Sequence, residues 1–521
     1  MTAVSDTAVR GEARPAGQAF GSLAVTAAAV VLLGALTWAL WSARSWPLVH
    51  DASIMHYMVF LMDHGLAPYR DVPDLNMPGA HLSEALVMHT LGGDAAAWRL
   101  WDLILGLLAI GASAWIAGPG LRWAGVAAGV LGYLIHLEDG PLNLGQRDWL
   151  IAVLLLGALG CLRASLRGGN PAWIAGAALL CGWATSIKPH VLLVGLAFFA
   201  VLCWLIRPGP ADRRLSVRGG ILAVTLWAAI GMAPPTAMVV GYLTYWRAWP
   251  AFLDILHGLI PWYANLQRVP LGDMLRKSIA PILLVAALIT AFWPGRRGRG
   301  YDLEWALLGA AGGAALFLIQ DKGWSYHRYT EMVFFALWVA LACARGLQRN
   351  LPARVGGVVG LALCALIGLG LAWRASNATY PSRNLPVLES DLRRLGGPAL
   401  SGKVQCMDMV MGGCITALYE LKLVTATGII GDAGLFPDQP NAATAPYQRE
   451  FARAMAERPP QVVVISDYTW PGDHYTYDKL RKWPAFTAAL ARRYRLDHEV
   501  ATTADGVGYR LYVRNDLRPA H

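Results

Sequence analysis

Charged residues are scarce in this sequence. Asp, Glu, Lys and Arg make up 15% of the 521 residues and hydrophobic residues 56%, whereas a typical soluble domain carries about 25% charged residues. The net charge of +10 does not indicate a nucleic-acid partner, because the Arg residues stand in short clusters between apolar runs. Low charge combined with long apolar runs is typical of an integral membrane protein.

Common catalytic and metal-binding signatures are also missing. The seven Cys residues show no metal-ligand spacing, and the C-terminal part contains no glycine-rich phosphate loop and no nucleophile elbow. Of the seven, Cys406 and Cys414 alone lie in that polar part. They could form a disulfide in an oxidising compartment or remain two buried thiols, and the sequence does not decide between these interpretations. The first apolar run, about Phe20 to Trp41, lacks a small-residue cleavage site and predicts a membrane span rather than a signal peptide.

Long apolar runs recur through the first two thirds of the chain. Each of them is long enough for a helix to cross a hydrocarbon core of ~30 Å. The runs lie at 20–42, 98–117, 121–137, 148–163, 171–187, 190–206, 219–243, 278–294, 303–319, 330–346 and 355–373. The sequence therefore predicts a polytopic α-helical membrane protein with about eleven transmembrane helices.

Basic residues fall on alternate connections between these runs. If the N-terminus is on side one, that side receives Arg10, Arg14, Arg122, Arg163, Arg167, Arg207, Arg213, Arg214, Arg218, Arg296, Arg297, Arg299, Arg345, Arg349 and Arg354. The positive-inside rule places such clusters in the cytoplasm. We therefore predict a cytoplasmic N-terminal tail (1–19) and a transmembrane domain (20–374) with a long first external loop (42–97).

The last part of the chain, 375–521, has ordinary polar content. A β-like run covers 462–465, and helical stretches cover about 446–457 and 484–494. This alternation predicts an α/β domain. Because eleven spans, an odd number, separate it from the cytoplasmic N-terminus, the domain is predicted to lie outside the cytoplasm.

Three carboxylates in the first external loop are candidates for catalysis: Asp51, Asp71 and Asp74. An acid at a membrane interface usually faces water, a cavity or a functional cation, and a general base must reach the hydroxyl that it deprotonates. Asp51 directly follows the first span and is the strongest candidate. For Asp71, which has Arg70 as a ready ion-pair partner, and for Asp74 the alternative is a solvated turn.

Basic and aromatic residues stand near span ends in the other external loops. They are candidates for binding the donor phosphate: Arg147, Lys188, His190, Lys322, Tyr326, His327 and Arg328. Several cationic donors that converge would hold a phosphate at the level of the lipid headgroups. The alternative is that the long side chains anchor span ends in the interface. This alternative is weakest for Lys188, which lies in a three-residue break with Pro189 and His190.

The first external loop resembles that of GT-C glycosyltransferases. The resemblance rests on Asp51 followed by the segment 65–79 (GLAPYRDVPDLNMPG), on 145–148 (GQRD), on 188–190 (KPH) and on 322–327 (KGWSYH). The subgroup that it most resembles comprises bacterial relatives of protein O-mannosyltransferases and of the lipid A aminoarabinose transferase. The resemblance covers most of residues 20–350.

This resemblance implies an inverting transferase that uses a polyprenyl-phosphate sugar outside the cytoplasm, in the inner membrane of a bacterium. Asp51 would deprotonate an acceptor hydroxyl on a glycan, a lipid or a protein. The family often has Asp-Glu at this point, whereas Ala52 follows Asp51 here, so a second acid would come from Asp71 or Asp74 or would be dispensable. Some relatives bind a divalent cation near these acids, and a cation remains an open alternative without assigned ligands.

Three other functions remain as alternatives. A ligase or polymerase with a diphosphate-linked donor needs the same types of residue. A transporter or flippase would carry ionisable groups near the membrane midplane, where Asp102 is the one obvious candidate; it stands one turn after Arg99 and is predicted to pair with it at the interface. A non-catalytic assembly protein would act through the C-terminal domain alone.

Overall fold

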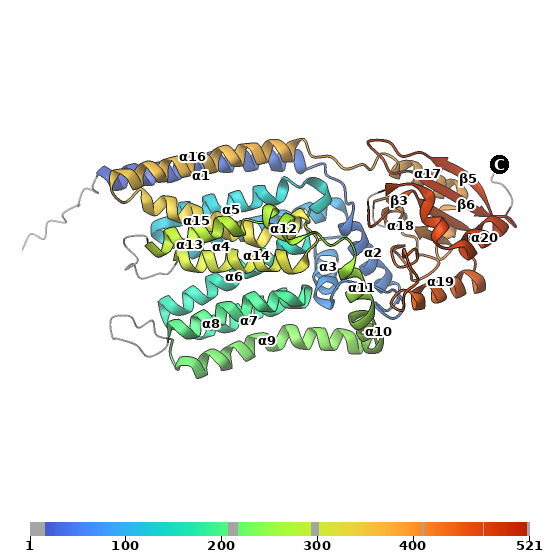
Figure 1. Cartoon of the computed structure of the whole chain (residues 1–521), viewed down its shortest axis with the longest axis horizontal. Coiled ribbons are helices and arrows are strands. Elements are labelled where there is room, and N and C mark those ends of the chain that lie inside the picture. The colour runs from blue at the N-terminus through green and yellow to red at the C-terminus, as the bar shows by residue number, and fades with distance from the viewer. Residues whose placement is uncertain (1–15, 207–216, 293–301, 409–410, 473, 518–521) are drawn as a thin grey trace, which may run out of the picture.

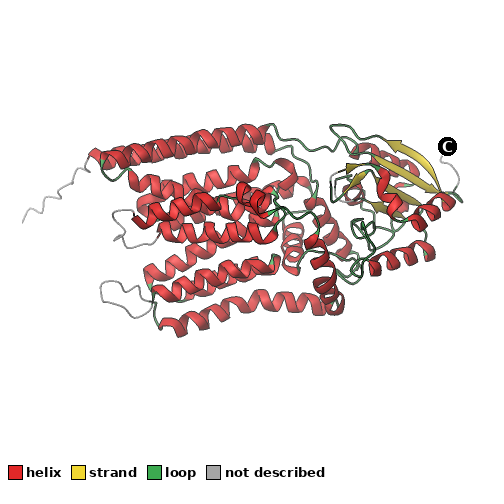
Figure 2. Cartoon of the chain, viewed as in Figure 1, coloured by secondary structure: helices red, strands yellow, loops and turns green. Residues whose placement is uncertain are grey.

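The computed structural model describes residues 16–206, 217–292, 302–408, 411–472 and 474–517. Long helices run side by side in a bundle, and a domain with a β-sheet caps one end of it (Figures 1 and 2). The bundle helices are α1 (Ala16–Ala43), α4 (Ala95–Ala117), α5 (Arg122–Leu137), α6 (Arg147–Gly168), α7 (Ala172–Ile187), α8 (Leu192–Leu205), α9 (Gly220–Tyr245), α13 (Ala280–Phe292), α14 (Asp302–Gln320), α15 (Tyr329–Gly346) and α16 (Leu351–Ser376).

These helices coincide with the eleven predicted apolar runs. Among the described residues, eight helices are long and apolar enough to cross a membrane, and α7, α8 and α13 are shorter apolar helices. Helices are expected here because backbone groups in hydrocarbon have to find their hydrogen-bond partners within the segment. Large side chains such as Leu222, Leu284 and Leu366 remain 64–69% exposed on the outer faces, where lipid would cover them. The prediction of a polytopic helical membrane fold is confirmed.

Short helices lie between the bundle and the sheet domain. They are α2 (Asp51–Asp63), α3 (Pro78–Thr90), α10 (Trp249–Asp254), α11 (Ile260–Asn265) and α12 (Leu271–Lys277), with a π-helical turn at Ile255–Leu259. The segments predicted only as external loops are therefore folded. In α2, residues 55–61 are all buried, because this helix packs against both the bundle and the domain.

The C-terminal domain is built on a four-stranded sheet of order β1-β2-β6-β5. Its strands are β1 (Val404–Met407), β2 (Val462–Ser466), β5 (Tyr494–Val500) and β6 (Tyr509–Arg514), and a small hairpin adds β3 (Tyr468–Thr469) and β4 (His474–Tyr475). Strands β1 and β2 are parallel, and the other pairs are antiparallel. The helices are α17 (Leu385–Leu395), α18 (Cys414–Glu420), α19 (Ala445–Glu457) and α20 (Pro484–Arg493).

The predicted strand 462–465 and the two predicted helices correspond to β2, α19 and α20, which confirms the α/β character of this domain. Of the two alternatives for its cysteines, the structure has the disulfide between Cys406 and Cys414.

The domain is fastened to the first external loop by buried polar contacts. Tyr57 donates to the carbonyl of Leu423 over 3.0 Å, and Thr416 donates to Ser53 over 2.8 Å. The backbone of residue 428 approaches the carbonyl of Asp71 so closely that a β-carbon on Gly428 would lie 1.6 Å from that oxygen. Glycine is the residue that permits such an approach.

The predicted cytoplasmic basic residues are only partly described. Arg10, Arg14, Arg207, Arg213, Arg214, Arg296, Arg297 and Arg299 lie outside the described residues, as does most of the predicted N-terminal tail. The connections α6–α7 and α15–α16 lie at the end of the bundle opposite the sheet domain (Figure 1). Arg167 stands in the last turn of α6, next to the first connection, and Arg349 stands in the second. Near that end Arg163 and Arg345 both contact the carboxylate of Asp302.

Candidate active site

A cavity of about 1020 Å³ lies at the junction of the bundle and the C-terminal domain. It is lined by residues from the first external loop (42–97), from the connections α5–α6, α7–α8, α9–α13 and α14–α15 with the adjoining helix ends, and from the domain. Eight of the ten predicted site residues are among them: Asp51, Asp74, Arg147, Lys188, His190, Lys322, Tyr326 and His327. The topology thus brings together side chains that are separated by up to 276 residues in sequence.

Asp51 is the first residue of α2 and lies outside the membrane spans. Its Oδ2 accepts hydrogen bonds from Arg147 Nη2 over 2.8 Å and from Gln146 Nε2 over 3.2 Å, and its side chain is 25% exposed toward the cavity. Burial raises the pKa of the Asp51 carboxyl, but His50, Arg147, the hydrogen bond from Gln146 and Lys188 together lower it by more, so the pKa lies below its usual value. Asp51 is therefore a carboxylate at neutral pH.

Asp74 is tied into a chain of hydrogen bonds. One of its oxygens accepts from the Asn76 side chain over 2.8 Å, and the other contacts His81 Nε2 over 2.7 Å. Nδ1 of His81 lies 2.7 Å from the hydroxyl of Tyr242 on α9. Because Asn76 in turn accepts from Arg147, Asp74 is linked to Asp51 through this chain and is suited to positioning rather than to proton transfer.

Lys188 lies in the break between α7 and α8. Its Nζ contacts both carboxylate oxygens of Asp148 over 2.8 and 2.9 Å and the side-chain oxygen of Gln320 over 2.8 Å. The side chain is 21% exposed. One face of the ammonium group is thus held in place, while the residue borders the cavity. A fixed cation of this kind is suited to binding an anion.

Lys322 also lines the cavity, but its ammonium group points at the backbone. It donates to the carbonyls of Tyr263, Ala264 and Leu266 at the end of α11. Those carbonyls are among the groups that a helix end leaves without intrahelical partners. In this arrangement Lys322 fixes the loop that carries Tyr263.

Two predicted site residues do not line the cavity, Asp71 and Arg328. Asp71 accepts from the Arg70 guanidinium over 2.9 and 3.0 Å and from the Ala67 amide over 2.8 Å, which is the ion-paired turn that was the alternative for it. Arg328 contacts the buried Glu331 over 3.2 Å. Both residues are occupied in structural contacts.

The two predicted histidines each have a buried ring nitrogen, His190 Nε2 and His327 Nδ1, that finds no hydrogen-bond partner within the described part of the chain. Both residues line the cavity. A buried polar atom without a partner is unfavourable, and a ligand in the cavity reaches these nitrogens only if the surrounding side chains move.

The residues around Asp51 do not fit a divalent cation. Within the described ranges no three His, Cys, Asp or Glu side chains gather closely enough to hold a metal ion. The position next to the Asp51 carboxylate is taken by the guanidinium of Arg147, which also contacts Asn76. The cationic partner of the candidate base is therefore an arginine of the chain itself.

Sequence reasoning missed a second layer of residues. Asn76 accepts a hydrogen bond from Arg147. Gln146 donates one to Asp51, so both residues hold the Asp51–Arg147 pair. Asn76 lies in the segment 65–79 and Gln146 in 145–148. Their place in these two motifs could have indicated a role in the site. Asp102 lies behind them: it accepts from His136, from Tyr133 and from the amide of Gly145. The predicted pairing of Asp102 with Arg99 is wrong, because Asp102 faces the bundle interior and holds the loop that leads into α6.

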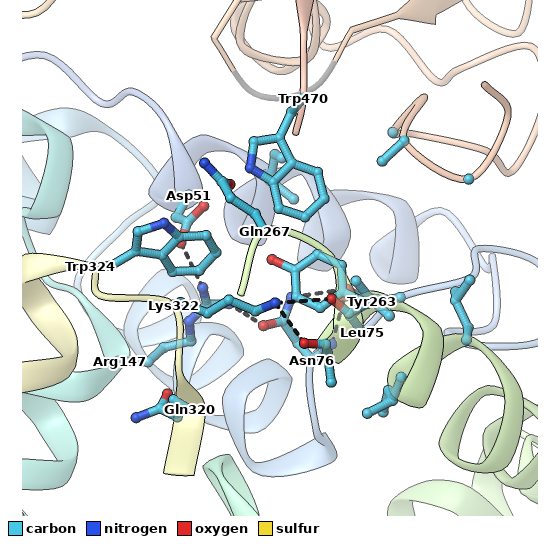
Figure 3. A pocket seen from close by; sticks show the side chains of 18 of the residues that line it. Asp51, Leu75, Asn76, Arg147, Tyr263, Gln267, Gln320, Lys322, Trp324 and Trp470 are labelled. Carbon is cyan, nitrogen blue, oxygen red and sulfur yellow. Dashed lines mark hydrogen bonds and ion pairs between the residues drawn. The ribbon is translucent and has the colours of Figure 1, made fainter. Parts of the chain in front are cut away.

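Aromatic side chains complete the site. Tyr263 from the α11 loop and Trp470 from the domain stack with ring centroids 5.2 Å apart. Figure 3 shows Trp470 reaching from the domain toward Tyr263 and Gln267, with Asp51, Arg147 and Trp324 around the same space. No sequence motif indicated Trp470, because only the fold brings it to this place.

No protein-family model matches the sequence, and no curated protein is significantly similar to it. Solved structures are similar in fold. The crystal structure of ArnT from Cupriavidus metallidurans bound to undecaprenyl phosphate superposes with a TM-score of 0.52 at 13% identity, over 92% of this chain and 97% of that one. The same protein in the apo state gives 0.51 at 14% identity, over 95% and 98%.

The oligosaccharyltransferase of Archaeoglobus fulgidus, tethered to an acceptor peptide, superposes with a TM-score of 0.50 at 14% identity, over 92% of this chain and 73% of that one. ArnT is the lipid A aminoarabinose transferase, and both proteins belong to the GT-C superfamily. The likeness establishes the architecture: this chain shares the fold of ArnT and of the archaeal oligosaccharyltransferase, a polytopic helical bundle with a C-terminal domain.

Proposed function

We propose that this protein is a membrane glycosyltransferase that moves a sugar from a polyprenyl-phosphate donor to an acceptor hydroxyl. One observation carries the proposal. A carboxylate at the start of α2 and two basic side chains from other loops, Arg147 and Lys188, border one cavity at the end of the bundle that the C-terminal domain covers. The GT-C fold supports it, as does the undecaprenyl phosphate bound to the structurally similar ArnT.

The donor phosphate is placed between Lys188 and Arg147, beside the unpartnered nitrogen of His190. Both cations are held by carboxylates, Lys188 by Asp148 and Arg147 by Asp51, so they stand oriented before a ligand arrives. When the bond between the sugar and the phosphate breaks, negative charge grows on the phosphate, and preoriented cations in a sheltered cavity stabilise it.

Asp51 is the proposed general base. It takes the proton of the acceptor hydroxyl, the oxygen forms a bond to the anomeric carbon, and the lipid phosphate leaves from the opposite face with inversion. A phosphate that engages Arg147 would draw the guanidinium away from Asp51 and make the carboxylate a stronger base as the reaction starts. Asp74 acts through Asn76 by holding Arg147.

The proposed location is the inner membrane of a bacterium, with the N-terminus in the cytoplasm and the C-terminal domain, residues 375–521, outside. The transmembrane domain then covers 20–374. The cavity is lined by residues from the end of the bundle and from the domain, and these two parts lie next to each other in Figure 1. A headgroup phosphate would lie at this level when its lipid tail remains in the bilayer.

The test uses full-length protein in lipid nanodiscs with polyprenyl-phosphate sugars as donors and a cell-envelope extract as acceptor. Asp51→Asn is expected to lower the rate of transfer by about 10²- to 10⁴-fold, the usual contribution of a general base. Asp63→Asn is the matched control, because Asp63 ends the same helix and contacts only the exposed His89. Full activity of Asp51→Asn would remove Asp51 from the mechanism.

A further inference from the structure

The wall that the C-terminal domain contributes to the cavity carries no charged side chain among the described residues. Its lining residues are Met411, Ile429, Ile430, Gly431, Ala433, Gly434, Leu435, Tyr447, Tyr468, Trp470 and Tyr475. The bundle side of the same cavity holds Asp51, Arg147 and Lys188. As far as its lining is described, the cavity therefore has a charged pole, which the donor phosphate and the base require, and an aromatic wall without charged side chains opposite.

A buried ion pair keeps one carboxylate of the described residues away from this wall. The segment 429–435 contains one acid, Asp432, whose carboxylate turns away from the cavity to Lys479 Nζ at 2.6 Å. Lys479 is 2% exposed and also donates to the carbonyl of Tyr468 over 2.9 Å. One lysine thus fixes both the 429–435 segment and the strand that carries Tyr468, and it keeps a carboxylate out of the site.

Aromatic rings stand on both sides of the space. Tyr468 and Tyr475 pack with ring centroids 5.6 Å apart, and Trp470 from the domain stacks directly on Tyr263 from the α11 loop, with an angle of 26° between the rings. Trp324 faces the same space from the bundle (Figure 3). Flat apolar rings with polar edges suit a ligand that has apolar faces and a polar rim.

We infer that the acceptor is an uncharged saccharide of a growing glycan, bound by the wall that Trp470, Tyr468 and Tyr475 form. A pyranose ring has apolar C–H faces that pack on aromatic rings and hydroxyls that bond to backbone groups, so it needs no ionic partner. A phosphorylated lipid headgroup would need cations on this wall. The cavity volume of about 1020 Å³ lies at the upper end of the ~300–1,000 Å³ range of small-ligand sites.

This inference rests on the proposed transferase function, and the experiment separates the two. The gene is deleted in its own host and complemented with the full-length wild type, Asp51→Asn, Trp470→Ala, Trp470→Phe or Trp373→Ala. Linkage analysis by mass spectrometry then identifies the residue to which the missing sugar is normally attached: another sugar, an amino acid, or a lipid phosphate or headgroup. Trp373 is the control because it is 59% exposed on α16.

The expected result is that deletion removes a sugar attached to another, uncharged sugar. Trp470→Ala should lower this product by about tenfold, the value of one aromatic contact, while Trp470→Phe restores most of it and Trp373→Ala leaves it unchanged at equal protein levels. Undecaprenyl phosphate binding, measured on the purified Trp470→Ala protein, should stay as in the wild type.

Loss of a sugar from an amino acid, from a lipid headgroup or from a charged sugar overturns the acceptor inference and leaves the transferase proposal standing. Wild-type product levels from Trp470→Ala would also overturn the inference. A deletion that changes none of the three linkages overturns the proposed function itself.

Discussion

At the scale of single residues, the ionisation of Asp51 is the property most open to a test. Gln146 donates to its Oδ2 over 3.2 Å, and a hydrogen bond to a carboxylate lowers its pKa. Burial acts in the opposite direction and raises the pKa of Asp51. Gln146→Met removes the hydrogen bond while burial remains, so the pKa of Asp51 should rise.

Because transfer requires the ionised base, the acid limb of the pH profile of kcat/KM should move to higher pH in Gln146→Met. Gln348→Met is the control, since Gln348 is exposed beyond the end of α15. An acid limb at the wild-type position, with protein of normal stability, would mean that a group other than Asp51 controls it.

The candidate site could be predicted from sequence only in part, and the reason is visible in individual residues. Asp51, Arg147 and Lys188 stand at or beside span ends, and the alternation of spans was enough to predict that they share one face. Trp470 and Lys479 lie far away in the chain, and only the docking of the domain brings Trp470 to the cavity. Lys322 was predicted to bind a phosphate. Its contacts with the three backbone carbonyls at the end of α11 could not be predicted from the sequence, because they depend on how α11 folds.

At the scale of elements, apolar length predicted the spans well, because a helix that crosses hydrocarbon must be long and uniformly apolar. The same rule could also have predicted that α2 is a buried helix. Its 13 residues, DASIMHYMVFLMD, are apolar but too short to span, which is typical of a helix buried inside a protein. For the C-terminal domain the sequence predicted the α/β class but not the order of the strands, because strand order depends on contacts between distant segments.

We predict that Lys322 holds the loop after α11 in place. Lys322→Met keeps most of the side-chain volume but leaves the carbonyls of Ala264 and Leu266 without the ammonium donor, while the Tyr263 carbonyl keeps the amide of Leu266. An unsatisfied buried acceptor costs about 1–3 kcal/mol. Hydrogen exchange at residues 260–267 should therefore accelerate by about tenfold or more, measured by mass spectrometry on protein in nanodiscs.

Lys277→Met is the control for this experiment, because the Lys277 side chain makes one long contact, 3.5 Å, to the carbonyl of Gly323. Unchanged exchange in Lys322→Met would show that Lys322 does not hold the loop. Addition of undecaprenyl phosphate to the wild type provides a second readout. Faster exchange at 260–267 on addition would show that the ammonium group leaves the carbonyls for the phosphate.

At the scale of the whole molecule, everything proposed here depends on the side of the membrane that the cavity faces. Arg167, in the last turn of α6, and Arg349, in the connection α15–α16, lie at one end of the bundle. The cavity, the sheet domain and the Cys406–Cys414 disulfide lie at the other. The positive-inside rule supports the proposal that the first end is cytoplasmic. Because disulfides persist in oxidising compartments, the disulfide supports the proposal that the second end lies outside.

Single cysteines test this orientation directly. Ala501→Cys, at an exposed position of the domain, should react with a membrane-impermeant maleimide in cells whose outer envelope has been opened and whose inner membrane is intact. Gln348→Cys, exposed at the opposite end, should react only after that membrane is permeabilised. The five free native cysteines give little background, because each is buried or half-buried. The reverse pattern would place Asp51 and the aromatic wall in the cytoplasm, and a donor presented on the outer leaflet would then be excluded.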